Sequence, residues 1–134
     1  LCSSWISHLP EEVSYGTVAG VGMNVRELEA NKRLTTLEAR DLNVDPTLPY
    51  ADNSFDAVLN VVSVDYMTKP LELFREMHRV LRPGGVAIMS FSNRCFPTKA
   101  VRVWLDTDET GRLAIVARYF HFSSPSWKGI RALD

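Results

Sequence analysis

The fold is decided by a stretch that begins Asp52-Asn53-Ser54-Phe55-Asp56-Ala57-Val58-Leu59-Asn60 and ends Arg82-Pro83-Gly84-Gly85-Val86-Ala87-Ile88-Met89-Ser90-Phe91. Its first apolar run, residues 55–62, is nearly continuous, as in a strand that is buried on both faces. Residues 69–81 follow, and their apolar side chains recur at helical spacing. A Pro-Gly-Gly turn then leads into residues 86–91. This order predicts a strand–helix–strand unit of a parallel sheet.

The rest of the chain extends the same alternation. Further predicted strands cover residues 17–21 and 36–40, with a helix over 25–33 capped by Asn24 between them. The weaker expectations are the end of a strand over 1–6, a short helix over 7–13, a loop over 43–54, a helix capped by Thr98, a helix with an acidic start at 106–109 and a last strand over 127–134. The alternation predicts one α/β domain over 1–134 with a mostly parallel sheet.

Composition narrows the class of protein. The chain has 134 residues, of which 46% are hydrophobic and 23% charged, and its net charge is −1. These values are typical of a soluble globular domain and give no basis for a nucleic-acid partner. Cys2 and Cys95 lie too far apart for metal-ligand spacing, so we expect no metal site. No apolar run reaches membrane-spanning length. The first residue is Leu1 rather than Met, which predicts a processed or incomplete chain.

Three segments resemble one family closely: Asp41-Leu42, residues 55–60 and residues 82–91. They are similar to the class I S-adenosylmethionine-dependent methyltransferases, in particular the type 11-like group. The resemblance implies a Rossmann-like sheet with helices on both faces and strand order 3-2-1-4-5-7-6. It also implies a truncated, partial domain that lacks most of strand 1 and strand 7, so that another segment or a partner would supply the missing strand.

In such sheets, ligands bind outside the carboxyl ends of the strands. The resemblance therefore implies S-adenosylmethionine as cofactor, held by residues that follow the first four strands: Cys2, Ser3, Ser4, Gly22, Met23, Asn24, Asp41, Leu42, Asn60, Val62 and Ser63. Alternatives stand beside these roles. Asp41 either accepts from adenine or caps its loop, Asn60 either lies beside the methionine part or bonds the strand end, and Asn24 is favoured as a helix cap. No catalytic residue stands out; Asp65-Tyr66 is the candidate substrate-facing pair.

Two departures from the family pattern open a second interpretation. Cys2, Ser4 and Ile6 stand where the family has glycines that let the backbone approach the cofactor, and no acidic residue follows the second strand. The first hypothesis is a methyltransferase acting on an unknown small molecule or protein. The second is a catalytically inactive, methyltransferase-like pseudoenzyme that serves as a structural subunit of a larger complex.

Residues 91–100 resemble a subgroup found in photosynthetic organisms. This resemblance implies an intracellular protein of the plastid (chloroplast) or cytoplasm. Arg94 or Lys99 in this segment either receives an anionic substrate or belongs to a solvated loop, and the loop interpretation is slightly favoured.

Overall fold

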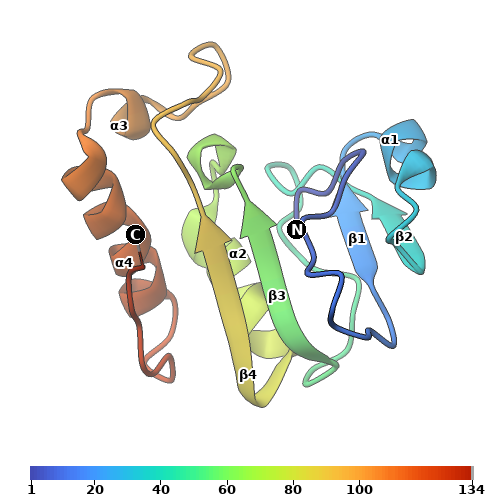
Figure 1. Cartoon of the computed structure of the whole chain (residues 1–134). Coiled ribbons are helices and arrows are strands. Elements are labelled where there is room, and N and C mark those ends of the chain that lie inside the picture. The colour runs from blue at the N-terminus through green and yellow to red at the C-terminus, as the bar shows by residue number, and fades with distance from the viewer. Residues whose placement is uncertain (134) are drawn as a thin grey trace.

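The computed structural model describes residues 1–133, and its strands form two small parallel sheets (Figure 1). β1 pairs with β2, and β3 pairs with β4, both in parallel. The elements are β1 (Ala19–Gly22), α1 (Val25–Ala30), β2 (Thr36–Ala39), β3 (Phe55–Val61), η1 (Val64–Tyr66), α2 (Pro70–Val80), β4 (Leu81–Ser90), α3 (Arg102–Leu105) and α4 (Glu109–Ser123). The expected α/β class with parallel strands and helices is confirmed.

The strand–helix–strand unit forms as the sequence predicts. Ala57 lies opposite Val86, and the register runs on to Val61 opposite Ser90. α2 ends at Val80, and residues 82–85 bulge out of β4 before the regular ladder begins. Gly84 has φ +83° there, a left-handed backbone that favours glycine. The Pro-Gly-Gly turn thus sets where β4 joins β3.

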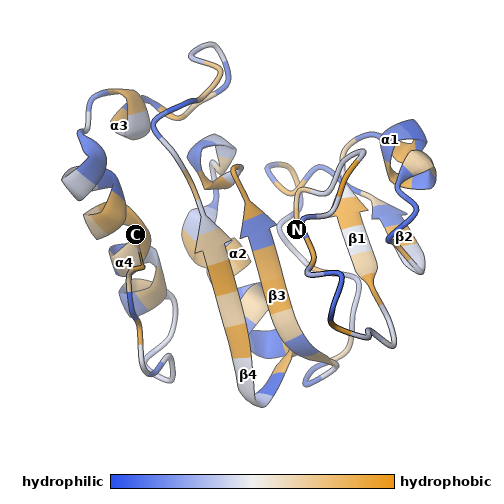
Figure 2. Cartoon of the chain, viewed as in Figure 1, coloured by the Kyte–Doolittle hydropathy of each residue, from blue (hydrophilic) through white to orange (hydrophobic). Residues whose placement is uncertain are grey.

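The core lies between the β3–β4 sheet and the helices α2 and α4. α2 buries the face that carries Leu73, Phe74 and Met77. The Phe74 ring meets the Phe120 ring of α4 at 4.8 Å and 70°, an edge-to-face geometry that is favourable for aromatic pairs. Figure 2 shows the apolar character of β3 and β4 along most of their length. Burial of this helical stripe is what attaches α2 to the sheet.

The first residues of the chain lie between the two sheets, where the N-terminus appears in Figure 1. The Ser3 N–H donates to the Val21 carbonyl of β1 at 2.7 Å, and the Leu1 amino group donates to the Leu59 carbonyl of β3 at 2.5 Å. The spatial order is therefore β2, β1, the N-terminal residues, β3 and β4. The two half-sheets are linked through these few bonds.

The N-terminal predictions need correction. Residues 1–6 form no strand, because Leu1 and Ser3 each reach only one neighbour by a backbone bond. Residues 7–13 form no helix. Nucleation of a helix is unfavourable, and a segment this short adds too few backbone hydrogen bonds to offset it. Pro10 also has no backbone N–H to donate. The helix after Asn24 ends at Ala30 instead of residue 33, since Asn31 caps it.

The C-terminal predictions are right in part. α4 begins at Glu109 with Asp108 as cap, so the acidic start is confirmed. α3 begins at Arg102, not after Thr98, because residues 96–100 form a separate turn. Residues 127–133 form no strand, and Trp127 instead packs against Phe120 with ring centroids 5.1 Å apart; position 134 lies outside the described residues. Within 1–133, no helix is long and apolar enough to cross a membrane.

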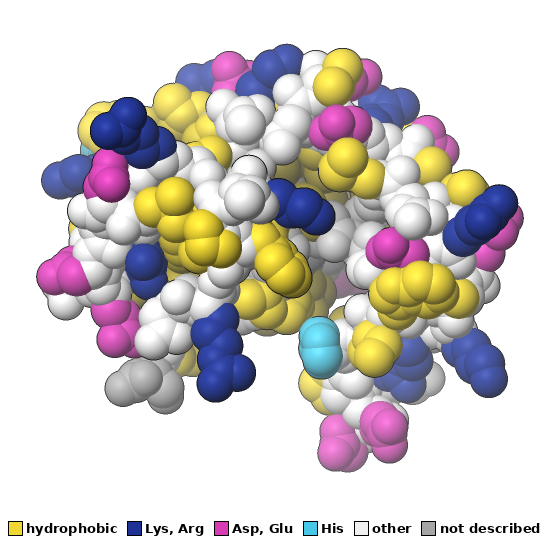
Figure 3. Space-filling model, turned by 90° about the horizontal axis from the view of Figure 1, so that it is seen from above, with side chains coloured by type: hydrophobic (Ala, Val, Ile, Leu, Met, Phe, Trp, Pro, Cys, Tyr) yellow, Lys and Arg dark blue, Asp and Glu magenta, His cyan; other side chains and the backbone are white. Residues whose placement is uncertain are grey.

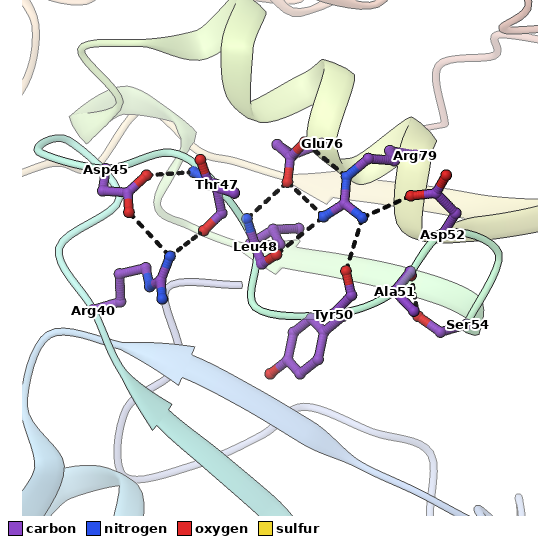
Figure 4. A network of polar contacts seen from close by, with 10 residues as sticks. All are labelled: Arg40, Asp45, Thr47, Leu48, Tyr50, Ala51, Asp52, Ser54, Glu76 and Arg79. Atoms are coloured by element: carbon purple, nitrogen blue, oxygen red, sulfur yellow. Dashed lines mark hydrogen bonds and ion pairs between the residues drawn. The ribbon is translucent and has the colours of Figure 1, made fainter.

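One arginine fastens the long loop before β3 to α2 (Figure 4). Arg79 donates to the carbonyls of Leu48 at 3.0 Å and Tyr50 at 2.8 Å, and it pairs with the carboxylates of Asp52 and Glu76. Glu76 in turn accepts from the Leu48 N–H at 2.8 Å. The predicted loop over 43–54 is confirmed, and its position depends on this cluster.

Candidate functional site

The site to examine is the edge at which the parallel strands end. Figure 3 looks down on this edge and shows the surface hollowed between the two halves of the molecule. Because parallel strands place their carboxyl ends together, the segments after β1, β2 and β3 meet there. The N-terminal residues lie at the same edge, because Ser3 is bonded to Val21 of β1 and Leu1 to Leu59 of β3.

Ser3 and Gly22 are in close contact at this edge. A Cβ on Gly22 would lie 2.1 Å from the Ser3 carbonyl oxygen, so any other residue there would displace the backbone. The Ser4 hydroxyl donates to the Glu27 carboxylate of α1. Cys2 has φ 52°, and burial raises the pKa of its thiol. Ser3 is thus held against the end of β1 and Ser4 against α1, while Cys2 precedes them in the same segment.

Asn60 lies at the centre of the edge and is fully buried. Its side-chain nitrogen donates weakly to the Leu1 carbonyl at 3.4 Å, while its side-chain oxygen has no hydrogen-bond partner among residues 1–133. A buried polar atom left unpaired costs about 1–3 kcal/mol. Asn60 therefore retains an unpaired acceptor that lies beneath the surface of this edge.

Asp41 and Leu42 follow β2. Asp41 Oδ1 accepts from the Asn43 N–H at 2.9 Å, so Asp41 does cap its loop. Its second carboxylate oxygen makes no hydrogen bond within the described chain. Leu42 is buried in the core cluster. The capping role and a ligand contact are compatible, because each uses a different oxygen.

Asn24 acts as a helix cap, as the sequence favoured. Its Oδ1 accepts from the Arg26 N–H at 3.1 Å, and its Nδ2 donates to Glu27 Oε1 at 3.0 Å. Met23 beside it is 73% exposed. Glu27 was not identified from the sequence, although it is the carboxylate that Ser4 and Asn24 both contact. The one feature of the sequence that could have pointed to Glu27 is its position in the first turn of a predicted helix that directly follows a predicted strand.

Val62 and Ser63 follow β3. Val62 has φ 49°, which is strained for a β-branched residue, and its N–H donates to the Ser90 carbonyl at 2.8 Å. The Ser63 hydroxyl donates to the Val61 carbonyl at 2.9 Å. This backbone conformation turns the chain at the end of β3, and the Val62 side chain is 43% exposed there.

Asn43 is a second residue that sequence reasoning missed. Its side chain donates to the Tyr66 carbonyl and accepts from the Thr68 N–H, both at 2.9 Å. It therefore clamps the loop after β2 onto the turn after β3. A polar residue two positions beyond the acidic residue was visible in the sequence, but its partners 23 and 25 residues away were not.

Asp65 and Tyr66, the expected substrate-facing pair, differ in their surroundings. Asp65 is 2% exposed, and its Oδ2 has no partner within the described residues, so burial raises the pKa of this carboxyl. Tyr66 accepts from the Phe96 N–H at 2.9 Å and stacks on the Phe96 ring. Asp65 faces the interior and not an open surface. Among residues 1–133 no three metal-ligating side chains gather at one point.

Cys2, Ser4 and Ile6, which stand where the family has glycines, differ in where their side chains lie. Ile6 is 70% exposed, so its side chain does not fill the interior. The main cavity, of about 420 Å³, is lined by residues 1–9 together with parts of β1 and β3, and Gly22 and Asp41 are not among its lining residues. Cys2, Ser3, Ser4, Val62 and Ser63 do line this cavity, so it adjoins the carboxyl edge at the N-terminal segment and at the exit of β3.

Comparison with known families gives one match. Residues 3–89 match the family described as "Methyltransferase domain". This segment includes Ser3, β1, β2, β3, α2 and nearly all of β4. It therefore contains almost every residue of the carboxyl edge described above.

Curated relatives agree with the family match. A demethylmenaquinone methyltransferase of Staphylococcus epidermidis is 37% identical over 90 residues, which cover 64% of this chain and 37% of the relative. A ubiquinone biosynthesis O-methyltransferase of Ruegeria pomeroyi is 38% identical over 77 residues, which cover 58% of this chain and 28% of the relative. The chain thus spans less than two-fifths of the length of these two relatives.

Solved structures support the fold. A chain from the complex between the Haloferax volcanii Trm112 methyltransferase activator and a putative methyltransferase aligns with TM-score 0.60 and 17% identity, covering 84% of this chain and 52% of that chain. A S-adenosylmethionine-dependent methyltransferase from Aquifex aeolicus aligns with TM-score 0.53 and 14% identity, covering 77% of this chain and 57% of that chain.

Proposed function

Because this chain belongs to the methyltransferase-domain family, we propose that it binds S-adenosylmethionine at the carboxyl edge of its sheet and takes part in methyl transfer to a small molecule or a protein. The observation that carries the proposal is the convergence of Ser3, Gly22, Asp41 and Asn60 on one edge. These four residues come from four separate segments of the chain, and each follows or abuts a strand end.

The free polar groups fit the parts of this cofactor. The second oxygen of Asp41 is available to an amino group of a purine. Glu27, held by Ser4 and Asn24, supplies a carboxylate at the end of β1, where ribose hydroxyls need an acceptor. Gly22 keeps the backbone accessible beside Ser3.

The cofactor, when bound, supplies an activated methyl group. The chain contributes position: the strand exits and the strained Val62 turn hold the edge in one shape. Asp65 is buried, so it is not presented to a substrate as a general base. Methyl transfer by direct displacement depends mainly on alignment of the two reactants, which a rigid edge provides.

Calorimetric titration with S-adenosylmethionine tests the proposal. We expect saturable heat, and we expect Asp41→Asn to weaken binding roughly tenfold, because one hydrogen bond to a charged group is lost while Asn still caps the loop. Asp106→Asn removes the same charge from the exposed residue that caps the end of α3, and it should leave binding unchanged. Absence of heat at millimolar ligand would contradict the proposal and favour the inactive, complex-forming alternative.

Other features remain predictions. We propose that residues 1–134 act as part of one methyltransferase domain, whose substrate and protein partners are open. Plastid or cytoplasmic location is expected from the resemblance to photosynthetic relatives alone. Imaging of the tagged chain in cells of a photosynthetic organism tests the location, and exclusion from both compartments would contradict it.

A further inference from the structure

Asn43 links two strand exits that no backbone ladder joins. Among the described residues β2 pairs only with β1 and β3 only with β4, so the loop after β2 is placed against the turn after β3 by other bonds. The Asn43 side chain donates to the Tyr66 carbonyl and accepts from the Thr68 N–H, both at 2.9 Å. Lys69 Nζ adds a bond to the Val44 carbonyl at 2.7 Å. Asn43 is the residue that uses a donor and an acceptor at once in this link.

Asp41 holds the backbone of the same residue. Its Oδ1 accepts from the Asn43 N–H at 2.9 Å. Its second oxygen is the one that the proposed function gives to the cofactor. A ligand on that oxygen restrains the carboxylate, and the carboxylate restrains the backbone from which the Asn43 side chain projects. Asn43 is thus one hydrogen bond away from the proposed cofactor contact.

Tyr66 extends the link to the loop of residues 92–100, which connects β4 to α3 (Figure 1). The Tyr66 hydroxyl accepts from the Phe96 N–H at 2.9 Å, and the two rings stack with centroids 6.5 Å apart. Most residues of this loop are exposed. Within the described chain, the bond to Tyr66 is the only hydrogen bond that joins residues 92–100 to a residue outside them. The position of the loop therefore depends on Tyr66.

We propose that Asn43 is a positioning residue that couples two sides of the candidate site: a cofactor held at Asp41 restrains the loop of residues 92–100 through Asn43 and Tyr66. The coupling rests on the proposed function, because it takes the cofactor to bind at Asp41. Since coupling between two sites is reciprocal, a molecule that holds this loop also strengthens cofactor binding. The link is a continuous set of hydrogen bonds, so its members can be removed one at a time.

Amide hydrogen exchange on the full chain tests the link without a ligand. Asn43→Ala removes both side-chain bonds and keeps the backbone N–H of this residue. We expect exchange at the Phe96 amide to become about tenfold faster, because Tyr66 loses the bond that fixes its carbonyl. The Gly111 amide, which is bonded to a side chain at the start of α4, is the internal reference and should not change. Unchanged exchange at Phe96 would show that Asn43 acts only locally and would refute the link.

Two further variants test the route through Tyr66. In a Tyr66→Phe chain the Phe96 N–H has already lost its acceptor, so adding Asn43→Ala should change its exchange by less than about twofold. A further tenfold increase would overturn the role of Tyr66. Asn93→Ala is the matched control, because Asn93 lies in the same loop and its side chain makes no hydrogen bond within the described chain. It should leave exchange at Phe96 unchanged.

S-adenosylhomocysteine tests the coupling to the cofactor. At saturation, judged by calorimetry, we expect exchange at Phe96 to be about tenfold slower than in the free chain, and we expect no such change in Asn43→Ala. Saturable heat without slower exchange at Phe96 would refute the coupling and leave the proposed function standing. Absence of heat would refute the proposed cofactor site and the coupling with it, whereas the exchange measured without ligand decides separately whether Asn43 positions the loop.

Discussion

Arg79 offers the sharpest test of how this fold is held together. Substituting Arg79→Lys keeps a positive charge at the same point of α2 but replaces a planar fork with a single nitrogen. The guanidinium reaches the carbonyls of Leu48 and Tyr50 and the carboxylates of Glu76 and Asp52 at once (Figure 4). One ammonium group cannot reach acceptors in so many directions.

The magnitude follows from the bonds that are lost. Two bonds from a charged donor to backbone carbonyls are lost, at about 1 kcal/mol or more each, whereas the pair with Glu76, one turn away on α2, is open to a lysine as well. The pair with Asp52 adds little, because Asp52 is 72% exposed and exposed ion pairs contribute about 0–1 kcal/mol. We therefore expect Arg79→Lys to lower the free energy of unfolding by about 2 kcal/mol, and Arg79→Ala by about 3 kcal/mol.

Urea unfolding followed by circular dichroism measures this difference. Arg75→Lys on the same helix is the matched control, because Arg75 is exposed and makes no ion pair or side-chain hydrogen bond within residues 1–133. A loss below about 0.5 kcal/mol for Arg79→Lys, close to the usual effect of a surface substitution, would refute the view that this cluster positions the loop before β3.

Three further substitutions test the core, the edge and the buried carboxyl. Phe74→Ala, at a fully buried ring, should lower the free energy of unfolding by about 3–5 kcal/mol; a loss under 1 kcal/mol would mean that α2 and α4 do not pack as described. Gly22→Ala places a methyl group against the Ser3 carbonyl and should cost about 1–3 kcal/mol, with chemical shifts changed at Ser3; an unshifted Ser3 amide would contradict that contact. Burial raises the pKa of Asp65, so the folded state binds its proton more tightly than the unfolded state, and stability should fall as the pH rises from about 4. Asp65→Asn should remove that slope and raise the urea midpoint at pH 7, whereas a lower midpoint would show that the charged form is stabilised.

Much of the fold was accessible from local patterns. The run at 55–62 predicts a strand and the stripe on residues 69–81 predicts a helix, and both elements form. The expected burial of this strand on both faces is wrong, because within β3 only Val58 and Asn60 are buried, while Asp56 and Ala57 are exposed. The segment at 7–13 shows the limit: a capping Ser and an early Pro indicate a helix, but a helix that short depends on tertiary packing that the sequence does not reveal. Residues 127–133 fail for the same reason, because Trp127 is held by aromatic contacts and not by a strand partner.

The positions of the candidate residues were predictable from the sequence, whereas their contacts were not. The rule that ligands lie beyond strand ends led to Gly22, Asp41 and Asn60, and these residues do share one edge. Glu27 and Asn43 escaped notice, since their roles rest on hydrogen bonds to residues that come together only through the sheet. A carboxylate in the first turn of a helix is ordinarily explained by the helix dipole alone.

Amide chemical-shift mapping during titration with S-adenosylhomocysteine reports where the ligand binds, and so it tests whether the carboxyl edge holds the cofactor. We expect the shifts to concentrate at Ser3, Gly22, Leu42 and Val62, with the α4 amides unchanged as the internal reference. Shifts confined to α4, or no saturable change at millimolar ligand, would show that the carboxyl edge of this sheet does not hold the cofactor.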